Sequence, residues 1–362
     1  MLQCGTGLPS KCFFPGTGRS SRKKIGELKE QDVTLSASTG ICPQNKLFYY
    51  FVFVLTVQGL SNYDKSVPSV VTIGTFDGVH VGHRKILERL IENGKQHGLQ
   101  STLLTFFPHP RMVLQKDSRI KLLNTIEEKS QILQDLGLDC LVIHPFTLEF
   151  SRMTAKKFVR EVLVEKLHVK KVIIGYDHRF GRNRNADIQD LRSFGNLLDF
   201  VVEEISAQEI DEVSVSSTKV RNALEAGDLE TANTYLGYAY MLSGTVEKGK
   251  RLGRDLGFPT ANLKVSADYK LIPSGGVYVV RCQIGGKQYH GMMNIGTNPT
   301  VDGTRQHIEI HFFEYQGDLY GASLEVALLG RIRDEQKFDS LYGLKSRLEK
   351  DKRHALKAIH KP

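Results

Sequence analysis

From Val67 onward, apolar positions follow two alternating patterns. The run V-P-S-V-V-T-I-G is typical of a buried strand, and the following H-R-K-I-L-E-R-L-I-E-N-G has apolar residues at helical spacing and ends at a glycine. The same two patterns recur downstream and predict strands at 101–107, 140–144 and 171–175 and helices at 126–136 and 155–166. Strands that alternate with helices predict a parallel sheet with helices on both faces.

A different pattern begins after two short predicted helices, 218–226 and 229–236. Beyond Gly237 the chain consists of short alternating runs: Y-M-L-S-G-T-V, G-V-Y-V-V-R-C-Q-I, K-Q-Y-H-G-M-M-N-I and H-I-E-I-H-F-F. Several short strands in succession predict a small antiparallel barrel. The last segment, 338–359, is amphipathic and basic and predicts a long terminal helix. The chain is therefore expected to be α/β followed by β.

The first 50 or so residues have no steady hydrophobic period and contain clusters of Gly, Ser and Pro. We interpret residues 1–54 as a disordered extension, with a misassigned start or a weak organelle transit peptide as alternatives. The apolar run 47–55 is about half as long as a membrane-spanning helix. It predicts a strand or an apolar patch, and no membrane association is expected.

Composition and charge narrow the function classes. Apolar residues at 40% and charged residues at 25% are close to the soluble globular average. The five cysteines are scattered without a C-x-x-C pair, so neither a disulfide framework nor a zinc cluster is indicated, and a cytoplasmic compartment is expected. The net charge of +9 arises at the two ends, since residues 66–330 carry 31 groups of each sign. Without a basic stripe on the folded body, nucleic acid is not an expected partner.

One candidate anion site links the first strand to the first helix, in G-T-F-D-G-V-H-V-G-H (74–83). In open α/β sheets, ligands bind at the carboxyl ends of strands, where helix N-termini attract phosphate. Three glycines allow close backbone approach: Gly74, Gly78 and Gly82. His80 and His83 can face one phosphate, and Asp77 can orient one of them. The alternatives are a pair of helix-cap histidines or a two-histidine metal site, although no third ligand has zinc-like spacing.

A second candidate segment is V-S-S-T-K-V-R (215–221), at the start of a predicted helix. Ser216, Ser217 and Thr218 offer hydroxyl groups, and Arg221 follows one turn later. Hydroxyls and a guanidinium at a helix N-terminus are suited to phosphate. By itself the S-S-T run would be a simple helix cap.

The barrel carries a third candidate segment, G-K-R-L-G-R-D-L-G-F-P-T-A-N (249–262). Its glycines can bring backbone amides against phosphate oxygens: Gly249, Gly253 and Gly257. Thr260 and Asn262 then offer oxygen ligands, which suit Mg²⁺ bound together with nucleotide phosphates. The alternative is a glycine-rich hairpin with a proline at a strand edge.

Together, H-x-G-H and S-S-T-x-x-R resemble the HxGH-type nucleotidyltransferases. The segments F-F-P-H-P, L-L-N-T-I-E-E-K, P-F-T-x-x-F and G-Y-D-H-R-F-G narrow the resemblance to the prokaryotic-type bifunctional riboflavin kinase/FMN adenylyltransferase, or FAD synthetase, family. In the barrel, G-F-P-T-A-N, N-I-G-T-N-P-T, I-E-I-H and G-D-L-Y-G are similar to flavokinases. The resemblance covers about residues 55–358.

This resemblance implies a Rossmann-like nucleotidyltransferase domain at 55–236 and a flavokinase-type antiparallel β-barrel with a terminal helix at 237–362. It implies that Mg²⁺ and ATP phosphorylate riboflavin to FMN, and that a second ATP then adenylylates FMN to FAD. The alternatives are a single active domain with the other silent, or a non-catalytic flavin-binding protein. We expect small-molecule substrates and a monomer or weak homo-oligomer.

Residue roles also follow from the resemblance. Glu309 matches the family's catalytic base, and it alternates with Ile308 and Ile310 along its predicted strand. His80 and His83 would stabilise the transition state at the α-phosphate. The remaining nucleotide contacts would come from Gly74, Phe76, Asp77, Gly82, Ser216, Ser217, Thr218 and Arg221, and flavin contacts from Asp177, Phe180 and Arg333. His178 stands where the family commonly has Phe.

Overall fold

The computed structural model describes residues 54–359, except 65, 116–119, 208–214, 250–251 and 301–302; for 252, 255, 297–300 and 303–305 it describes the backbone alone. The predicted extension at 1–54 lies outside the described residues, apart from Val54. The apolar run 47–55 is likewise described only at its end, where the first strand begins at Leu55.

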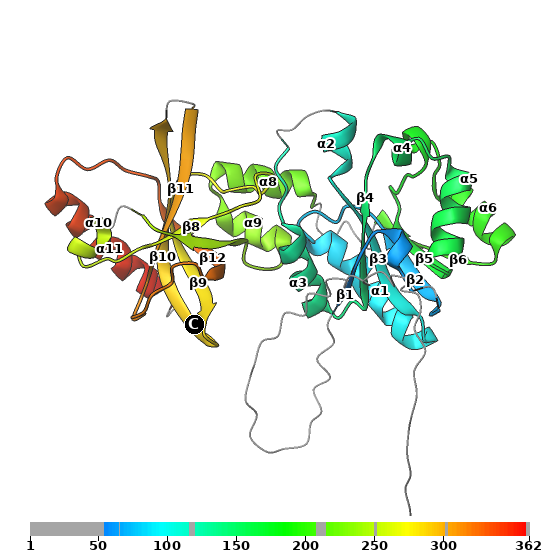
Figure 1. Cartoon of the computed structure of the whole chain (residues 1–362), viewed down its shortest axis with the longest axis horizontal. Helices are drawn as coiled ribbons and strands as arrows, with labels where there is room; N and C mark the ends of the chain where they lie inside the picture. Colours follow the sequence, from blue (N-terminus) through cyan, green and yellow to red (C-terminus); the bar gives the residue numbers. More distant parts are fainter. Residues whose placement is uncertain are drawn as a thin grey trace, which may run out of the picture. The chain divides into compact units, whose positions relative to one another are not determined.

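The N-terminal half contains a six-stranded parallel sheet in the order β1-β4-β3-β2-β5-β6 (Figure 1). Its strands are β1 (Leu55–Gln58), β2 (Ser69–Ile73), β3 (Gln100–Phe107), β4 (Cys140–Pro145), β5 (Val169–Gly175) and β6 (Val201–Ile205). The four central strands confirm the predicted ones. The edge strands β1 and β6 were not predicted, because their half-exposed sequences lack a continuous apolar run.

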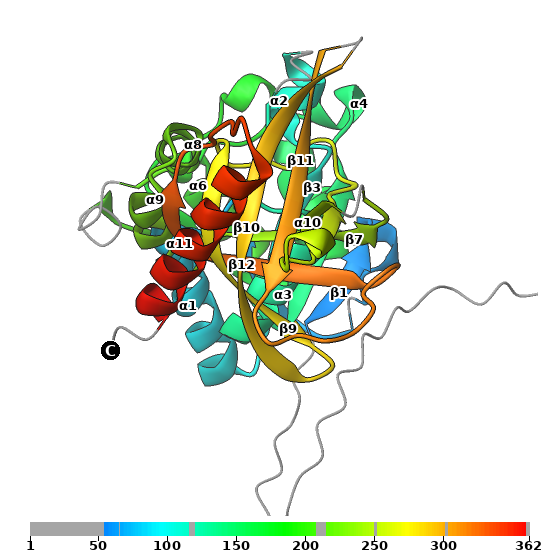
Figure 2. The ribbon, with the colours of Figure 1, turned by 90° about the vertical axis from the view of Figure 1, so that its left-hand side faces the viewer.

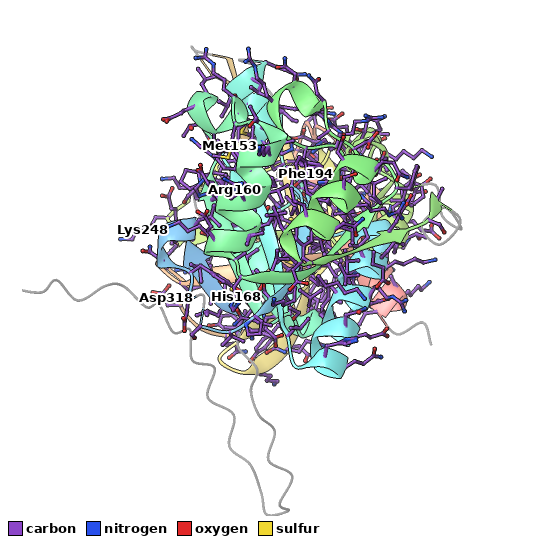
Figure 3. All side chains as sticks on the ribbon, turned by 90° about the vertical axis from the view of Figure 1, so that its right-hand side faces the viewer. Met153, Arg160, His168, Phe194, Lys248 and Asp318 are labelled. Carbon is purple, nitrogen blue, oxygen red and sulfur yellow. The ribbon has the colours of Figure 1, made fainter. Side chains whose placement is uncertain are left out.

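Helices cover both faces of this sheet, as the alternating pattern predicts. On one face α1 (Val81–His97) and α3 (Ile126–Leu136) pack over Val70, and on the other η2 (Phe158–Lys166) and α6 (Ile188–Leu198) pack over Val71. Figure 3 shows the second layer, with Arg160 on η2 and Phe194 on α6. The predicted helix 155–166 divides into α5 (Ala155–Lys157) and the π-helical η2. Shorter elements are η1 (Leu60–Asn62), α2 (Pro110–Leu114), α4 (Leu148–Ser151) and η3 (Arg182–Arg184).

The C-terminal half is a closed barrel in the order β10-β11-β8-β7-β12-β9. Its strands are β7 (Met241–Glu247), β8 (Ala261–Lys264), β9 (Gly276–Ile284), β10 (Lys287–Thr300), β11 (Gly303–Phe312) and β12 (Ser323–Arg333), and α10 (Leu252–Asp255) precedes β8. Helix α11 (Leu341–Ile359) packs against β9, β10 and β12 and is drawn in red in Figure 2. The barrel and the terminal helix confirm the predicted fold class, although α11 begins three residues later than the amphipathic pattern suggests.

Helices α8 (Ser217–Ala226) and α9 (Leu229–Leu236) share one hydrophobic core with the barrel. Val220 and Leu236 are fully buried in this core together with Ile310 and Val326 of the barrel strands. Leu123, from the segment before α3, is buried in the same cluster. The apolar faces of α8 and α9 therefore fix the start of α8, with its S-S-T-x-x-R motif, against the barrel.

In the part of the chain that the structure describes, no helix combines the length and apolarity needed to cross a membrane.

Candidate functional sites

The loop between β2 and α1 has a strained backbone. Its φ angle is +44° at Phe76 and +37° at Val79, a region that residues other than glycine rarely occupy, and +86° at Gly78. A Cβ atom on Gly78 would lie 2.5 Å from Cδ1 of Leu123. Such strain persists only where surrounding contacts impose the conformation, so the loop depends on its neighbours for its shape.

The two histidines of this loop lie against each other at the start of α1. Nδ1 of His80 accepts a hydrogen bond from the His83 N–H at 3.4 Å, and the ring centroids are 3.7 Å apart. Burial lowers the pKa of His80 to about 4, and burial together with the nearby His80 and Lys129 lowers the pKa of His83 well below 6.5. Both imidazoles are therefore neutral at pH 7. His80 is a helix cap, and both rings lie where an anion would meet the helix dipole.

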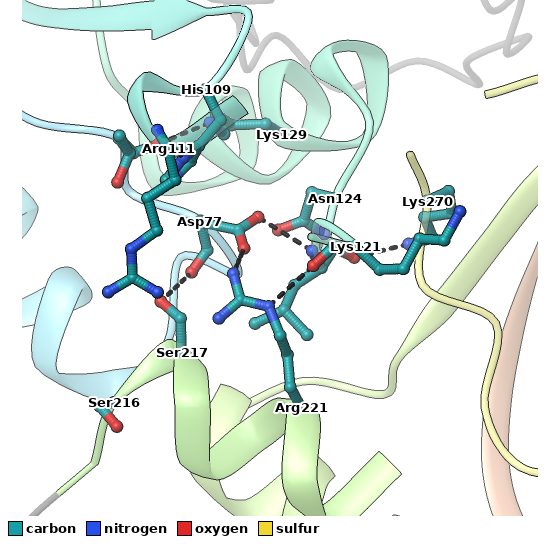
Figure 4. A network of polar contacts seen from close by, with 12 residues as sticks. Asp77, His109, Arg111, Lys121, Asn124, Lys129, Ser216, Ser217, Arg221 and Lys270 are labelled. Atoms are coloured by element: carbon teal, nitrogen blue, oxygen red, sulfur yellow. Dashed lines mark hydrogen bonds and ion pairs between the residues drawn. The ribbon is translucent and has the colours of Figure 1, made fainter. Parts of the chain in front are cut away.

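Asp77 joins this loop to two other segments. Its Oδ1 accepts from the Leu123 N–H at 2.9 Å, its Oδ2 is ion-paired with Arg221, and its main-chain oxygen accepts from Oγ of Ser217 at 2.8 Å (Figure 4). We expected Asp77 to orient a histidine, but the partners of its carboxylate in the structure are Leu123 and Arg221. The reason is that the half-buried guanidinium of Arg221 faces this carboxylate and neutralises it.

The S-S-T-x-x-R segment is thus brought to residues 74–83, the histidine loop, which includes the first turn of α1. Ser216 caps α8 by accepting from the Lys219 N–H at 3.3 Å, and Nε of Arg221 donates to the main-chain oxygen of Lys121 at 2.7 Å. The side chain of Thr218 is exposed at the same helix end. The two predicted phosphate-binding segments therefore lie side by side in the fold.

Two further residues of this region were not predicted from the sequence as part of a site. Lys129 on α3 is buried, its Nζ donates to the main-chain oxygen of Thr75 at 2.7 Å, and burial lowers its pKa to about 8, partly opposed by Asp77. His109 caps α2, and burial, partly opposed by Asp77, lowers its pKa to about 4. Both belong to segments used for the family resemblance, F-F-P-H-P and L-L-N-T-I-E-E-K. Only the fold shows that these segments return to the histidine loop.

A cavity of about 630 Å³ adjoins the histidine loop. Gly74, Phe76 and His83 line it from the loop, and Asp177 and Phe180 line it from the segment after β5. The remaining wall combines four phenylalanines with four arginines: Phe106, Phe146, Phe150 and Phe158, and Arg152, Arg179, Arg182 and Arg184. A cavity with aromatic side chains and several arginines suits a large planar ligand that also carries negative charge.

His178 departs from the family pattern in this cavity wall. Its ring stacks on Phe180 with centroids 6.2 Å apart, and burial lowers its pKa to about 4. Among the described residues, its buried Nε2 has no hydrogen-bond partner. The substitution of Phe by His therefore keeps an aromatic ring and adds a neutral polar atom.

The barrel site is built on two paired strands. Glu309 of β11 lies directly opposite Asn262 of β8. Ile308 and Ile310 are buried in the barrel core, which confirms the predicted alternation and turns Glu309 to the outer side. Glu309, Asn262 and Thr260 line one cavity of about 260 Å³, together with apolar side chains from α11.

The glycines before β8 are required by close backbone packing. A Cβ atom on Gly249 would collide with the side chain of Asn262, and one on Gly253 would collide with the main-chain oxygen of Phe258. Gly257 has a φ of +81°, which favours glycine. These contacts fold the glycine-rich segment onto the beginning of β8, beside Thr260 and Asn262, and its binding of phosphate stays a prediction.

Arg333 also lines the barrel cavity, but its guanidinium is already engaged. Nη2 and Nε of Arg333 donate to Oδ2 of Asp351 at 2.7 and 2.9 Å, and the Asp351 side chain is 0% exposed. This bidentate pair fastens α11 to the end of β12. Arg333 therefore forms the cavity wall by holding the terminal helix in place.

Comparisons with known proteins address both halves. A family model described as FAD synthetase matches residues 63–219, and one described as riboflavin kinase matches residues 236–359. The bifunctional riboflavin kinase/FMN adenylyltransferase of Listeria monocytogenes is 37% identical over 287 residues, covering 79% of this chain and 90% of the relative. The protein of that name from Escherichia coli K12 is 37% identical over 300 residues, covering 82% and 95%.

Among solved structures, one reported as a macrolide-efflux protein from Streptococcus pneumoniae is similar to this chain. Its TM-score is 0.75 at 28% identity, and the match covers 84% of this chain and 99% of that one. The two-part architecture is therefore shared along nearly the whole length of that protein.

Proposed function

The chain belongs to the bifunctional riboflavin kinase/FMN adenylyltransferase family, and we propose that residues 237–362 carry its kinase reaction and residues 55–236 its adenylyl transfer. As an enzyme of FAD biosynthesis, it phosphorylates riboflavin with ATP to FMN and then transfers AMP from a second ATP to FMN. The products of the second step are FAD and pyrophosphate. ATP and flavins are its substrates.

For the kinase reaction, Glu309 is the proposed general base. A ribityl hydroxyl is a poor nucleophile until a positioned carboxylate accepts its proton. The hydroxyl oxygen then forms a bond to the γ-phosphorus of ATP as the bond to ADP breaks. The single observation that carries this assignment is that Glu309 and Asn262 are direct partners across β11 and β8 and line the same cavity.

Thr260 and Asn262 are the proposed ligands of Mg²⁺. Their hydroxyl and amide oxygens are hard donors, and Mg²⁺ is usually held by few protein oxygens together with waters and nucleotide phosphates. The donor set therefore fits this ion. When bound, Mg²⁺ supplies charge neutralisation at the transferring phosphoryl group.

For adenylyl transfer, His80, His83 and Arg221 are proposed to surround the triphosphate of ATP. A phosphate oxygen of FMN forms a bond to the α-phosphorus as the bond to pyrophosphate breaks. Because this oxygen is already an anion, the residues need to orient it and stabilise charge rather than remove a proton. The neutral imidazoles donate hydrogen bonds near the α-phosphate, and Ser217, Thr218 and Arg221 bind the β- and γ-phosphates.

The flavin of this second reaction is proposed to occupy the aromatic cavity of about 630 Å³. Its isoalloxazine ring is planar and apolar on both faces, as the phenylalanine-rich wall requires. Asp177 and Phe180 line the same cavity as His83, and the flavin phosphate is proposed to point toward His83.

The decisive experiment is chromatographic product analysis with riboflavin, ATP and Mg²⁺, using the wild type, Glu309→Gln and His83→Ala. We expect FMN and FAD from the wild type, FAD only from supplied FMN with Glu309→Gln, and FMN alone with His83→Ala. Glu349→Gln is the matched control, since Glu349 is an exposed residue of α11. A wild type that forms neither product would leave a flavin-binding role in place of the enzyme.

Two further properties belong to the same proposal. The enzyme is expected to act in the cytoplasm as a monomer or weak homo-oligomer, without nucleic acid as a partner. Light scattering of the purified full chain tests the oligomeric state, and a stable higher assembly would contradict it.

A further inference from the structure

Lys270, in the barrel half, reaches into the N-terminal half. Its Nζ donates to Oε2 of Glu128 and to the main-chain oxygen of Leu123, each at 2.6 Å. The side chains of Lys270 and Glu128 are both 0% exposed. The ammonium also lies 4.3 Å from the ring centroid of Tyr240. A fully buried charge with these partners is held in a single position.

The barrel makes backbone contacts with the same segment of the N-terminal half. The Leu122 N–H donates to the main-chain oxygen of Tyr269 at 2.6 Å, and the Leu271 N–H donates to the main-chain oxygen of Leu122 at 2.8 Å. Oε1 of Glu128 accepts from the Ser243 N–H of β7 at 3.0 Å. The segment from Leu122 to Glu128 is therefore fixed by the barrel at both ends.

This segment in turn supports the adenylyl-transfer site. While the carbonyl of Leu123 accepts from Lys270, its N–H donates to Asp77, and Asp77 pairs with Arg221 (Figure 4). A chain of three contacts therefore joins the barrel lysine to the proposed phosphate-binding arginine. The strained loop 74–80, which depends on its neighbours for its shape, is one member of this chain.

We propose that Lys270, although it belongs to the kinase half, is a positioning residue for adenylyl transfer: by fixing Leu123 it sets Asp77 and Arg221 for the phosphates of ATP. The proposal rests on the function proposed above. Lys270 does not line the 260 Å³ cavity that contains Glu309, although it borders a different cavity together with Asn262. The kinase half completes the adenylyl-transfer site, and adenylyl transfer is expected to be the more sensitive of the two reactions to this contact.

The test uses the full chain with Lys270→Met combined with Glu128→Gln. The single Lys270→Met variant would leave a buried carboxylate without its cation and destabilise the fold. In the double variant neither of these two positions buries a charge, and the amide oxygen of the new glutamine still accepts from the Ser243 N–H, although the bond from the Thr125 N–H is lost. FMN formation and FAD formation are assayed in one preparation, so the kinase reaction reports on folding. Lys264→Met, at an exposed ion pair on β8, is the matched control.

We expect kcat/KM for ATP in adenylyl transfer to fall about tenfold, the effect of losing one charged hydrogen bond, mainly through KM. The kinase rate should stay within about twofold of the wild type, and Lys270→Arg, which retains a buried cation, should lose less. Parallel loss of both activities would show a purely structural role and overturn the proposal, as would unchanged adenylyl transfer. Absence of FAD formation by the wild type would instead refute the proposed function before any variant is compared.

Discussion

The two candidate sites of this enzyme are assembled in different ways. In the barrel, Glu309 and Asn262 are neighbours because β11 and β8 pair, so the regular hydrogen bonding of the sheet places them. In the N-terminal half, Asp77 and Arg221 are 144 positions apart and meet only through side-chain contacts. The first site depends on strand register, and the second on a set of contacts between separate segments.

This difference predicts that the two candidate sites are unequally sensitive to substitution. A sheet distributes positional information over many backbone hydrogen bonds, whereas the histidine loop relies on a few bonds to Ser217, Leu123 and Tyr238. Single substitutions that break these bonds should therefore impair FAD formation and spare FMN formation. Four experiments test this contrast.

The largest effect is expected from Arg221→Lys. A lysine can pair with Asp77 but cannot also bond the main-chain oxygen of Lys121 and face phosphate, because it lacks the planar guanidinium. Adenylyl-transfer kcat/KM should fall about a hundredfold, as for loss of one transition-state donor. The kinase rate should be unchanged, and Arg192→Lys, at a partly exposed pair with Glu204, should change neither rate. A matching loss of kinase activity would contradict the independence of the barrel site.

The next effect is expected from Gly78→Ala. The added methyl would meet Leu123 at 2.5 Å in a backbone with a φ of +86°. We expect the free energy of unfolding, measured by thermal unfolding, to fall by about 2–4 kcal/mol, and FAD formation to be impaired. Gly98→Ala is the matched control, because its φ is +64° with open space around it, and it should cost about 1 kcal/mol. Equal costs at both positions would show that contact with Leu123 does not constrain the loop.

A smaller effect is expected in the pH dependence of kcat/KM for FAD formation. The pKa of Lys129 is lowered to about 8 by burial, partly opposed by Asp77, so its ammonium is lost as the pH rises above that value. If this charge assists phosphate binding, kcat/KM for FAD formation falls about tenfold per pH unit above 8. Arginine stays protonated, so Lys129→Arg should move this decline upward. The pKa of His80, near 4, implies no decline from this group between pH 5 and 7. A pH profile unaltered by Lys129→Arg would show that the charge of this lysine does not assist phosphate binding.

The smallest effect is expected at the barrel cavity. Arg333→Lys loses the bidentate contact with Asp351 and loosens α11 against the cavity. We expect KM for riboflavin to rise about threefold, with kcat nearly unchanged, since the strand-borne residues stay in place. Arg353→Lys, at an exposed position of the same helix, is the control. A large fall in kcat would show that the barrel site also depends on a side-chain junction.

Much of the fold could be predicted from local patterns. Apolar periodicity identified the four central strands of the sheet, the main helices and the change to a barrel after Gly237. It missed β1 and β6, which are sheet edges, and β8 and β12, whose sequences contain polar residues or a bend. The alternation Ile308-Glu309-Ile310 correctly predicted which side of β11 the carboxylate occupies, because strand geometry fixes side-chain direction.

The sequence by itself determined which residue types are available and which motifs contain them: H-x-G-H, S-S-T-x-x-R, P-T-A-N and I-E-I-H. The tertiary structure alone decided that Asp77 pairs with Arg221 rather than orienting a histidine, and that Lys270 of one half fixes Leu123 of the other. Periodicity records whether a position is buried, because burial repeats with the turn of a helix or the pleat of a strand. The partners of a buried charge are set by which distant backbone and side-chain groups meet when the domains pack, and no local pattern encodes that meeting.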